Sequence, residues 1–187
     1  ADEYRTARCG IGAVFQHPED QIVTTVTEDD VAFGPENLAI EHDEIGLRIS
    51  GSLDAVDMSD YRASDPTRMS GGQQQRIAIA GMLAMDSDVL VLDEPTSYLD
   101  IRYQIDLLRI LRHLAKSRNV AVIMSIHELE LAQKSADKVI CVKDGRVFRA
   151  GAPEDIFTRE TIGELYGLQH GTFNERFGSV EIGRPHG

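Results

Sequence analysis

Apolar and polar positions along the chain predict strand, helix, strand, helix and strand in that order. Short apolar runs predict buried strands at 9–15, 88–92 and 120–126. Apolar residues at helical spacing predict helices over 73–85 and 101–118. The second helix should bury a stripe formed by Ile105, Leu108, Leu111, Leu114 and Ala115. This order of elements is typical of a parallel α/β sheet.

Outside this core the signals are shorter. Residue 27 begins an acidic, helix-prone segment, and we expect Thr27 to cap its helix with Asp30 three positions on. Further helices are predicted at 129–135, 153–157 and 161–166. Two strands, 138–142 and 146–149, flank a turn at 143–145 and form a predicted hairpin. The tail, 167–187, is polar and glycine-rich, and no element is predicted there.

Composition narrows the class of protein. The 187 residues suit one domain, or one domain with a subdomain. A formal net charge of −12 argues against nucleic acid as a partner. Cys9 and Cys141 each lie in an apolar strand, so we expect buried thiols rather than a disulfide or a metal pair. No apolar run reaches membrane-spanning length. The first residues lack an initiator Met, and we expect a longer protein.

Polar groups follow three of the predicted strands directly. Gln16, the Asp93–Glu94 pair and His127 each stand at a strand end, where parallel α/β folds place their ligands. Asp93 can hold Mg²⁺ through water and substrate phosphates, and Glu94 can then polarise a water for attack on a γ-phosphate. An acidic pair after an apolar run is by itself more often a solvated strand end. The following Pro95-Thr96-Ser97-Tyr98-Leu99-Asp100 makes the functional interpretation stronger.

A second anion site is predicted at Ser70-Gly71-Gly72-Gln73, which opens a helix. Two glycines let backbone N–H groups approach an anion, and the helix N-terminus adds positive partial charge. The alternative is a serine N-cap with nothing bound. Its place about twenty residues before the acidic pair favours the anion site.

Two further residues keep alternatives open. His127 is suited to a γ-phosphate contact or to positioning the attacking water, although a lone histidine there is more often structural. Gln16 is suited to contact Mg²⁺ or the attacking water through its amide, although a simple loop glutamine is the plainer interpretation.

Together these motifs resemble the nucleotide-binding subunits of ATP-binding-cassette transporters. Gln16 matches the Q-loop, MSGGQ at 69–73 the LSGGQ signature, VLVLDE at 89–94 Walker B, SYLD at 97–100 the D-loop, and His127 the switch histidine. The resemblance implies a RecA-like P-loop NTPase sheet, with residues 1–26 as partial core, 27–68 as an inserted helical subdomain, 69–150 as signature helix and core, and 151–187 as C-terminal helices and tail.

The same resemblance implies roles and partners. Glu94 and His127 would be catalytic. Ser70, Gly71, Gly72, Gln73, Gln16 and Asp100 would bind ATP, while Asp93 and Gln16 would hold Mg²⁺. A second cassette subunit, identical or not, and integral membrane subunits would be partners at the cytoplasmic face of the membrane. Residues 15–38 and 76–85 look like energy-coupling-factor importer ATPases, whereas the sequence beyond Asp93 is similar to iron-chelate and cobalamin importer ATPases. Both indicate import.

One departure from the family pattern changes the expected activity. The phosphate loop G-x-x-x-x-G-K-[ST] should precede Gln16, yet the dipeptide Gly-Lys is absent from these residues. We therefore expect the Walker A strand, loop and helix to be missing, sheet edge and face to be exposed, and this chain alone to be inactive. The alternatives are a non-transport cassette protein and a catalytically incomplete partner that lends its signature loop to an intact subunit.

Overall fold

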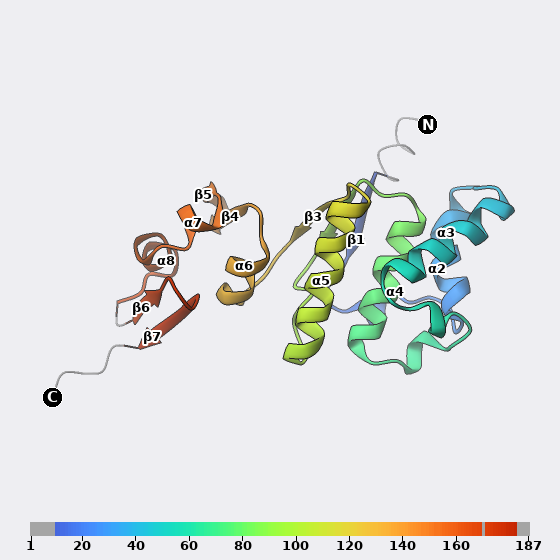
Figure 1. Cartoon of the computed structure of the whole chain (residues 1–187), viewed down its shortest axis with the longest axis horizontal. Coiled ribbons are helices and arrows are strands. Elements are labelled where there is room, and N and C mark those ends of the chain that lie inside the picture. The colour runs from blue at the N-terminus through green and yellow to red at the C-terminus, as the bar shows by residue number, and fades with distance from the viewer. Residues whose placement is uncertain (1–9, 170, 183–187) are drawn as a thin grey trace. The chain divides into compact units, whose positions relative to one another are not determined.

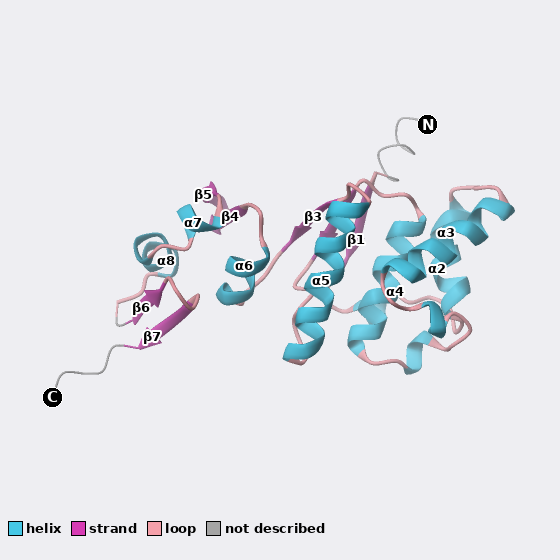
Figure 2. Ribbon diagram, viewed as in Figure 1, coloured by secondary structure: helices cyan, strands magenta, loops and turns pink. Residues whose placement is uncertain are grey.

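The computed structural model describes residues 10–169 and 171–182. The chain forms two compact units. The first compact unit ends at Ser125, and the second begins at Ile126. Figures 1 and 2 show the two units, and each is described by itself below.

A three-stranded parallel sheet organises the first unit. Its strands are β1 (Ile11–Val14), β2 (Val89–Leu92) and β3 (Ala121–Met124), in the order β1-β2-β3. The register aligns Val14 with Leu92 and Leu92 with Met124, so the three strands end level with one another. The parallel sheet predicted from the apolar runs is present.

Among residues 10–125, helices cover one face of this sheet. Gly12, Val14, Leu90 and Leu92 are buried on the face that helices α4 and α5 contact. On the opposite face Ile11 and Ile123 are 57% and 56% exposed, and Val91 is 38% exposed. Parallel sheets are ordinarily covered on both faces, and the described side chains on this face are apolar and exposed.

The helices of the first unit pack around α4 (Gly71–Ala84), which contacts β1 (Figure 1). Helices α2 (Thr27–Asn37) and α3 (His42–Ala55) pack on α4 and on each other. Short 3-10 turns lie at Pro18–Asp20, Ser59–Tyr61 and Pro66–Arg68. The core combines Leu90 and Leu92 of the sheet with apolar residues of these helices, including Val31, Ile49, Leu53, Ile77 and Ile79.

The predicted capping role of Thr27 is wrong. Val26 is the N-cap of α2, and Thr27 is its first helical residue. The Thr27 hydroxyl is buried and donates to the Ser64 carbonyl at 3.0 Å. Asp30 instead accepts from the backbone N–H groups of Val23 and Thr24, which fixes the chain just before the helix.

Helix α5 (Ile101–Ser117) has the predicted length, but its buried stripe is displaced from the predicted one. Leu111 and Leu114 are buried as expected, whereas Ile105 is 55% exposed and Leu107 and Ile110 are buried in its place. The difference is one of helix rotation, since apolar residues occur on more than one side of this helix and only packing selects among them.

The second unit is built from short elements. These are α6 (Leu129–Ser135), β4 (Val139–Lys143), β5 (Arg146–Gly151), α7 (Pro153–Ile156), α8 (Arg159–Tyr166), β6 (Gly171–Asn174) and β7 (Ser179–Ile182). The predicted hairpin is present, with Asp144 and Gly145 both at positive φ in its turn. Cys141 is buried, and burial raises the pKa of its thiol. Cys9 lies outside the described residues.

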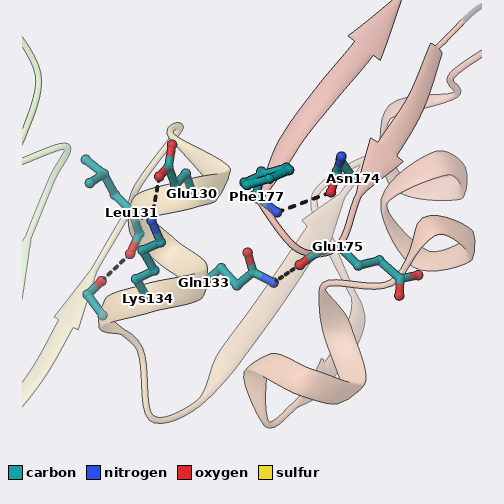
Figure 3. A network of polar contacts seen from close by, with 8 residues as sticks. Glu130, Leu131, Gln133, Lys134, Asn174, Glu175 and Phe177 are labelled. Atoms are coloured by element: carbon teal, nitrogen blue, oxygen red, sulfur yellow. Dashed lines mark hydrogen bonds and ion pairs between the residues drawn. The ribbon is translucent and has the colours of Figure 1, made fainter.

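The tail contains a second hairpin that the sequence did not predict. Strands β6 and β7 pair antiparallel, with Phe173 fully buried beside Phe157. Gln133 of α6 donates to the backbone carbonyl of Glu175 at 2.8 Å and ties this hairpin to the unit, as Figure 3 shows. The polar, glycine-rich composition of residues 167–187 hid this element.

Because β1 and α4 are in close contact, a side chain larger than that of glycine should be tolerated at some positions of these two elements and not at others. A Cβ added at Gly12 would stand 2.7 Å from the Met82 Cβ, so Gly12→Ala should destabilise the fold by roughly 1–3 kcal/mol. Gly81 lies in the same helix α4 with no neighbouring atom within 4 Å of an added Cβ, so Gly81→Ala should stabilise by up to about 1 kcal/mol. Urea unfolding measures both, and equal effects would contradict the packing described.

The ion pair between Arg62 and Glu28 should make a small, pH-dependent contribution to the free energy of unfolding. The Arg62 guanidinium donates to Glu28 of α2 and to Ser50 of α3, and it holds the pKa of Glu28 below its ordinary value. A depressed folded-state pKa stabilises the fold above the unfolded pKa near 4.5, and this term disappears as pH falls through the folded pKa. Because the pair is partly exposed, we expect at most about 1 kcal/mol.

Glu28→Gln should remove this term. Denaturant unfolding at pH 7 and pH 3 measures it, since the difference between the two proteins should be smaller at pH 3 than at pH 7. A difference that is the same at both pH values would exclude the ion pair as its source.

Candidate functional site

The candidate site lies at the carboxyl edge of the parallel sheet. The backbone N–H of Asp93 donates to the carbonyl of Val14 at 2.9 Å, and that of Ser125 donates to Leu92 at 3.1 Å. The sheet ladder therefore continues one step past β2 and β3. Side chains following the strands are brought to one edge although they come from distant parts of the sequence.

Gln16 and Glu94 meet at this edge. The Gln16 Nε2 donates to the Glu94 Oε2 at 2.7 Å, across 78 positions of sequence. The Ser97 hydroxyl donates to the same oxygen at 2.9 Å. Two donors on one oxygen fix the orientation of the carboxylate. The predicted association of the strand-end residues is thus observed for Gln16 and the acidic pair.

The backbone at Glu94 is in an uncommon conformation. Its φ is +44°, in the left-handed region that non-glycine residues seldom adopt. Such strain persists where the surroundings hold it, and it clusters at functional sites. Here the chain turns sharply out of β2 so that the Glu94 side chain faces Gln16.

Ser125 is a site residue that the sequence reasoning missed. Its hydroxyl donates to the Asp93 Oδ1 at 2.8 Å, and the Glu94 backbone N–H donates to the same hydroxyl oxygen at 2.7 Å. The available signal was a polar residue ending the AVIM run one position past Met124, which the register places opposite Asp93. Ser97 was likewise not assigned a role.

The loop that carries Gln16 is closed by a second glutamine. The Phe15 backbone N–H donates to the Gln21 Oε1 at 2.7 Å, and the Gln21 Nε2 donates to the Ala13 carbonyl at 3.0 Å. His17 stacks on Tyr98 with ring centroids 6.0 Å apart, which connects this loop to the segment after Glu94. The position of Gln16 is therefore set from both sides.

The predicted anion-binding turn opens α4 as a capping box. Ser70 is the N-cap, its Oγ accepts from the Gln73 N–H at 3.4 Å, and the Gln73 side chain accepts from the Ser70 N–H at 3.1 Å. This cap is compatible with both interpretations of the turn. Gly72 approaches Leu99, so the turn lies against the segment between Glu94 and α5.

Asp100 and His127 are placed less fully. Asp100 is the exposed N-cap of α5, and its side chain makes no capping hydrogen bond. His127 is exposed in the second unit, two residues beyond Ser125. Their assigned roles, and those of Ser70 to Gln73, stay predictions.

The donor set suits Mg²⁺ but does not form a cage. Asp93 and Glu94 supply carboxylate oxygens and Gln16 an amide oxygen, which are hard ligands. Among the residues that the structure describes, no group of three or more His, Cys, Asp or Glu side chains could hold a metal ion. Magnesium in phosphate-transfer sites is characteristically bound by one or two carboxylates together with substrate phosphates.

Comparison with known proteins identifies the family. Residues 1–97 match the family model described as ABC transporter. An ABC transporter ATP-binding protein of Bifidobacterium longum is 54% identical over 155 residues, covering 83% of this chain and 20% of that protein. An energy-coupling factor transporter ATP-binding protein of Streptococcus sanguinis is 40% identical over 155 residues, covering 83% and 55%. The chain belongs to the ABC transporter ATP-binding family, whose members hydrolyse ATP.

Solved structures confirm the α/β fold. The cbiO1 structure from Clostridium perfringens, part of the ABC transporter complex cbiONQ, has a TM-score of 0.78 and 31% identity, covering 92% of this chain and 67% of that one. A dimeric ATP-binding cassette in a post-hydrolysis state, bound to ADP and Pi, has a TM-score of 0.68 and 27% identity, covering 81% and 67%.

The chain is shorter than the relatives that it matches. The chain spans about half the length of the energy-coupling factor relatives and a fifth of the Bifidobacterium protein. Within the described residues, each helix is too short or too polar to cross a bilayer.

Gly72→Ala tests whether packing of the fold requires glycine at this position of the turn. An added Cβ would make ordinary contact with Leu99 at 3.4 Å, so the unfolding free energy should stay unchanged or rise by up to about 1 kcal/mol. Urea unfolding checks this directly. A loss above about 2 kcal/mol would show that packing requires the glycine.

Proposed function

We propose that these residues form the catalytic edge of an importer ATPase, which couples MgATP binding and hydrolysis to transport. The observation that carries this is the Gln16–Glu94 hydrogen bond beside Asp93 at the end of β2. It gives a carboxylate that is oriented and adjacent to a second carboxylate. Such a pair supports one acidic group as base and the other as metal ligand.

Glu94 is the proposed general base. It accepts a proton from the water that attacks the γ-phosphate, while Gln16 and Ser97 hold its Oε2 in place. Gln16 also presents an amide oxygen to the metal or the attacking water. Mg²⁺, when bound, would neutralise charge on the phosphates, with Asp93 and Gln16 as the groups that hold it.

The remaining predicted residues complete the proposal. Ser70, Gly71, Gly72 and Gln73 bind phosphate of the ATP held by a second cassette subunit, and Asp100 contributes at the same interface. His127 contacts the γ-phosphate or positions the water. Closure and reopening of the cassette dimer moves integral membrane subunits at the cytoplasmic face of the membrane. Similarity to the dimeric ATP-binding cassette supports a dimer, and similarity to cbiO1 and to energy-coupling factor proteins supports assembly with a transporter.

The transported substrate is proposed as a metal ion, metal chelate or vitamin. The energy-coupling factor relatives support import as the function. A metal-chelate type ABC transporter structure supports a metal chelate as the substrate. Its TM-score is 0.73 at 28% identity, and the match covers 85% of this chain and 64% of the other. The resemblance beyond Asp93 to iron-chelate importers is part of this proposal.

The complete ATP site needs a phosphate loop that these residues do not supply. The sequence has no Gly-Lys dipeptide. Without the loop's backbone N–H groups and lysine, the β- and γ-phosphates lose their main cradle. We therefore propose that this exact chain alone has negligible ATPase activity.

A second candidate function follows from the same missing dipeptide. The chain would be a catalytically incomplete partner that lends its signature turn to an intact cassette subunit. Stimulation of such a subunit's ATPase by this chain would favour it over the first proposal.

The intact mass of the protein as its native cell makes it separates the two proposals. A mass several kilodaltons above 20.7 kDa, with an extension carrying G-x-x-x-x-G-K-[ST], supports the importer ATPase. A mass of 20.7 kDa supports the incomplete partner.

Glu94→Gln then tests the chemistry. In the native-length protein it should reduce ATP turnover by roughly a hundredfold or more, because a general base contributes that much. Phosphate release from MgATP is the measurement, with Glu160→Gln at an exposed position of α8 as matched control. Mg²⁺-dependent turnover by the 187-residue chain alone, lost on Glu94→Gln, would overturn the predicted inactivity.

A further inference from the structure

We propose that Ser125 is a positioning residue for ATP hydrolysis, which sets the Asp93 carboxylate and the Glu94 backbone with one hydroxyl group. This inference rests on the proposed function of Asp93 and Glu94. Ser125 touches neither substrate nor metal in this role and acts only through those two residues.

The two hydrogen bonds use the hydroxyl in both of its capacities. Its single O–H donates to the Asp93 Oδ1 at 2.8 Å, while a lone pair on the same oxygen accepts the Glu94 N–H at 2.7 Å. Because the O–H is committed to the carboxylate, the lone pairs are directed toward the amide. The hydroxyl therefore fixes the relative placement of two consecutive residues.

The second bond falls where the backbone most needs support. Glu94 has a φ of +44°, a conformation that an L residue keeps only when its surroundings impose it. Its N–H points at Ser125, so the peptide plane between Asp93 and Glu94 is anchored to the neighbouring strand. If that anchor is lost, the Glu94 side chain is no longer delivered to Gln16 and Ser97 in one orientation.

Ser125 is itself held by the sheet. Its backbone N–H donates to Leu92 at 3.1 Å, directly after the paired residues Leu92 and Met124. The hydroxyl oxygen thus has a position determined by strand pairing and is independent of the loop it supports. A rigid strand supporting a strained turn is the arrangement that preorganises a catalytic group.

The test compares three variants with the unaltered protein at native length. Ser125→Ala removes the hydroxyl, and Ser125→Thr restores it on a slightly larger side chain. Ser117→Ala is the matched control, because the Ser117 hydroxyl donates to a carbonyl within α5, that of His113 at 2.8 Å. Thermal melting of each variant checks that it is folded.

Steady-state kinetics give the first readout. In Ser125→Ala, kcat for MgATP should fall roughly tenfold or more while KM changes less than about twofold, because the lost contacts position Asp93 and Glu94 and neither contact is made to nucleotide. Ser125→Thr should recover most of kcat, and Ser117→Ala should keep it. An unchanged kcat in Ser125→Ala, or a threonine variant as impaired as the alanine variant, overturns the proposal.

Backbone hydrogen exchange at Glu94 gives a readout that needs no turnover. In ¹⁵N-labelled protein the Glu94 N–H should exchange roughly tenfold or more faster in Ser125→Ala and normally in the other two variants. Exchange unchanged in Ser125→Ala overturns the proposal. If the unaltered protein hydrolyses no ATP, the proposed function fails, and this exchange measurement alone decides whether Ser125 places Glu94.

Discussion

The level register of three parallel strands is the constraint on which the site depends. Val14, Leu92 and Met124 stand in line across the sheet, so the residue after each strand emerges at the same edge. Gln16 and Glu94 are 78 positions apart in sequence, yet their side chains are in hydrogen-bond contact. A register shift of one residue in any strand would exchange its buried and exposed faces and would also separate these groups. Packing of the sheet on α4 and α5 fixes the strand register. It therefore also fixes the positions of Gln16 and Glu94.

Small polar side chains complete what the strands begin. Ser97 and Ser125 each place a hydroxyl against the acidic pair, one on the Glu94 carboxylate and one between Asp93 and the Glu94 backbone. The carboxylates supply the negative charge of the site, and the serine hydroxyls hold these carboxylates in one orientation. The strained backbone at Glu94 is stable because contacts from β3 and from the Gln16 loop surround it.

Sequence reasoning could predict what depends on local pattern. The apolar runs gave the three strands, the Asp-Gly turn gave the β4–β5 hairpin, and polar residues after strands gave Gln16, Asp93 and Glu94. It could not select the buried side of α5, where Ile105 is exposed and Ile110 buried, because only tertiary packing makes that choice. Nor could it assign Ser97 and Ser125. A serine carries no distinctive spacing, and its role appears only when the register places it beside Asp93. The tail hairpin was missed because the tail is polar and glycine-rich overall. Its stabilising contacts come from residues distant in sequence, among them Phe157 beside Phe173 and the Gln133 side chain on the Glu175 carbonyl.

The amide of Gln21 has an effect beyond the loop it closes. It occupies the Ala13 carbonyl and the Phe15 N–H, which face away from β2 on the outer side of β1. These are the groups that an incoming strand would pair with, and an exposed sheet edge is a template for unwanted association. One side chain thus satisfies two backbone groups that a neighbouring strand would use. A strand that added to the carboxyl end of β1 would have to displace the Gln21 amide first.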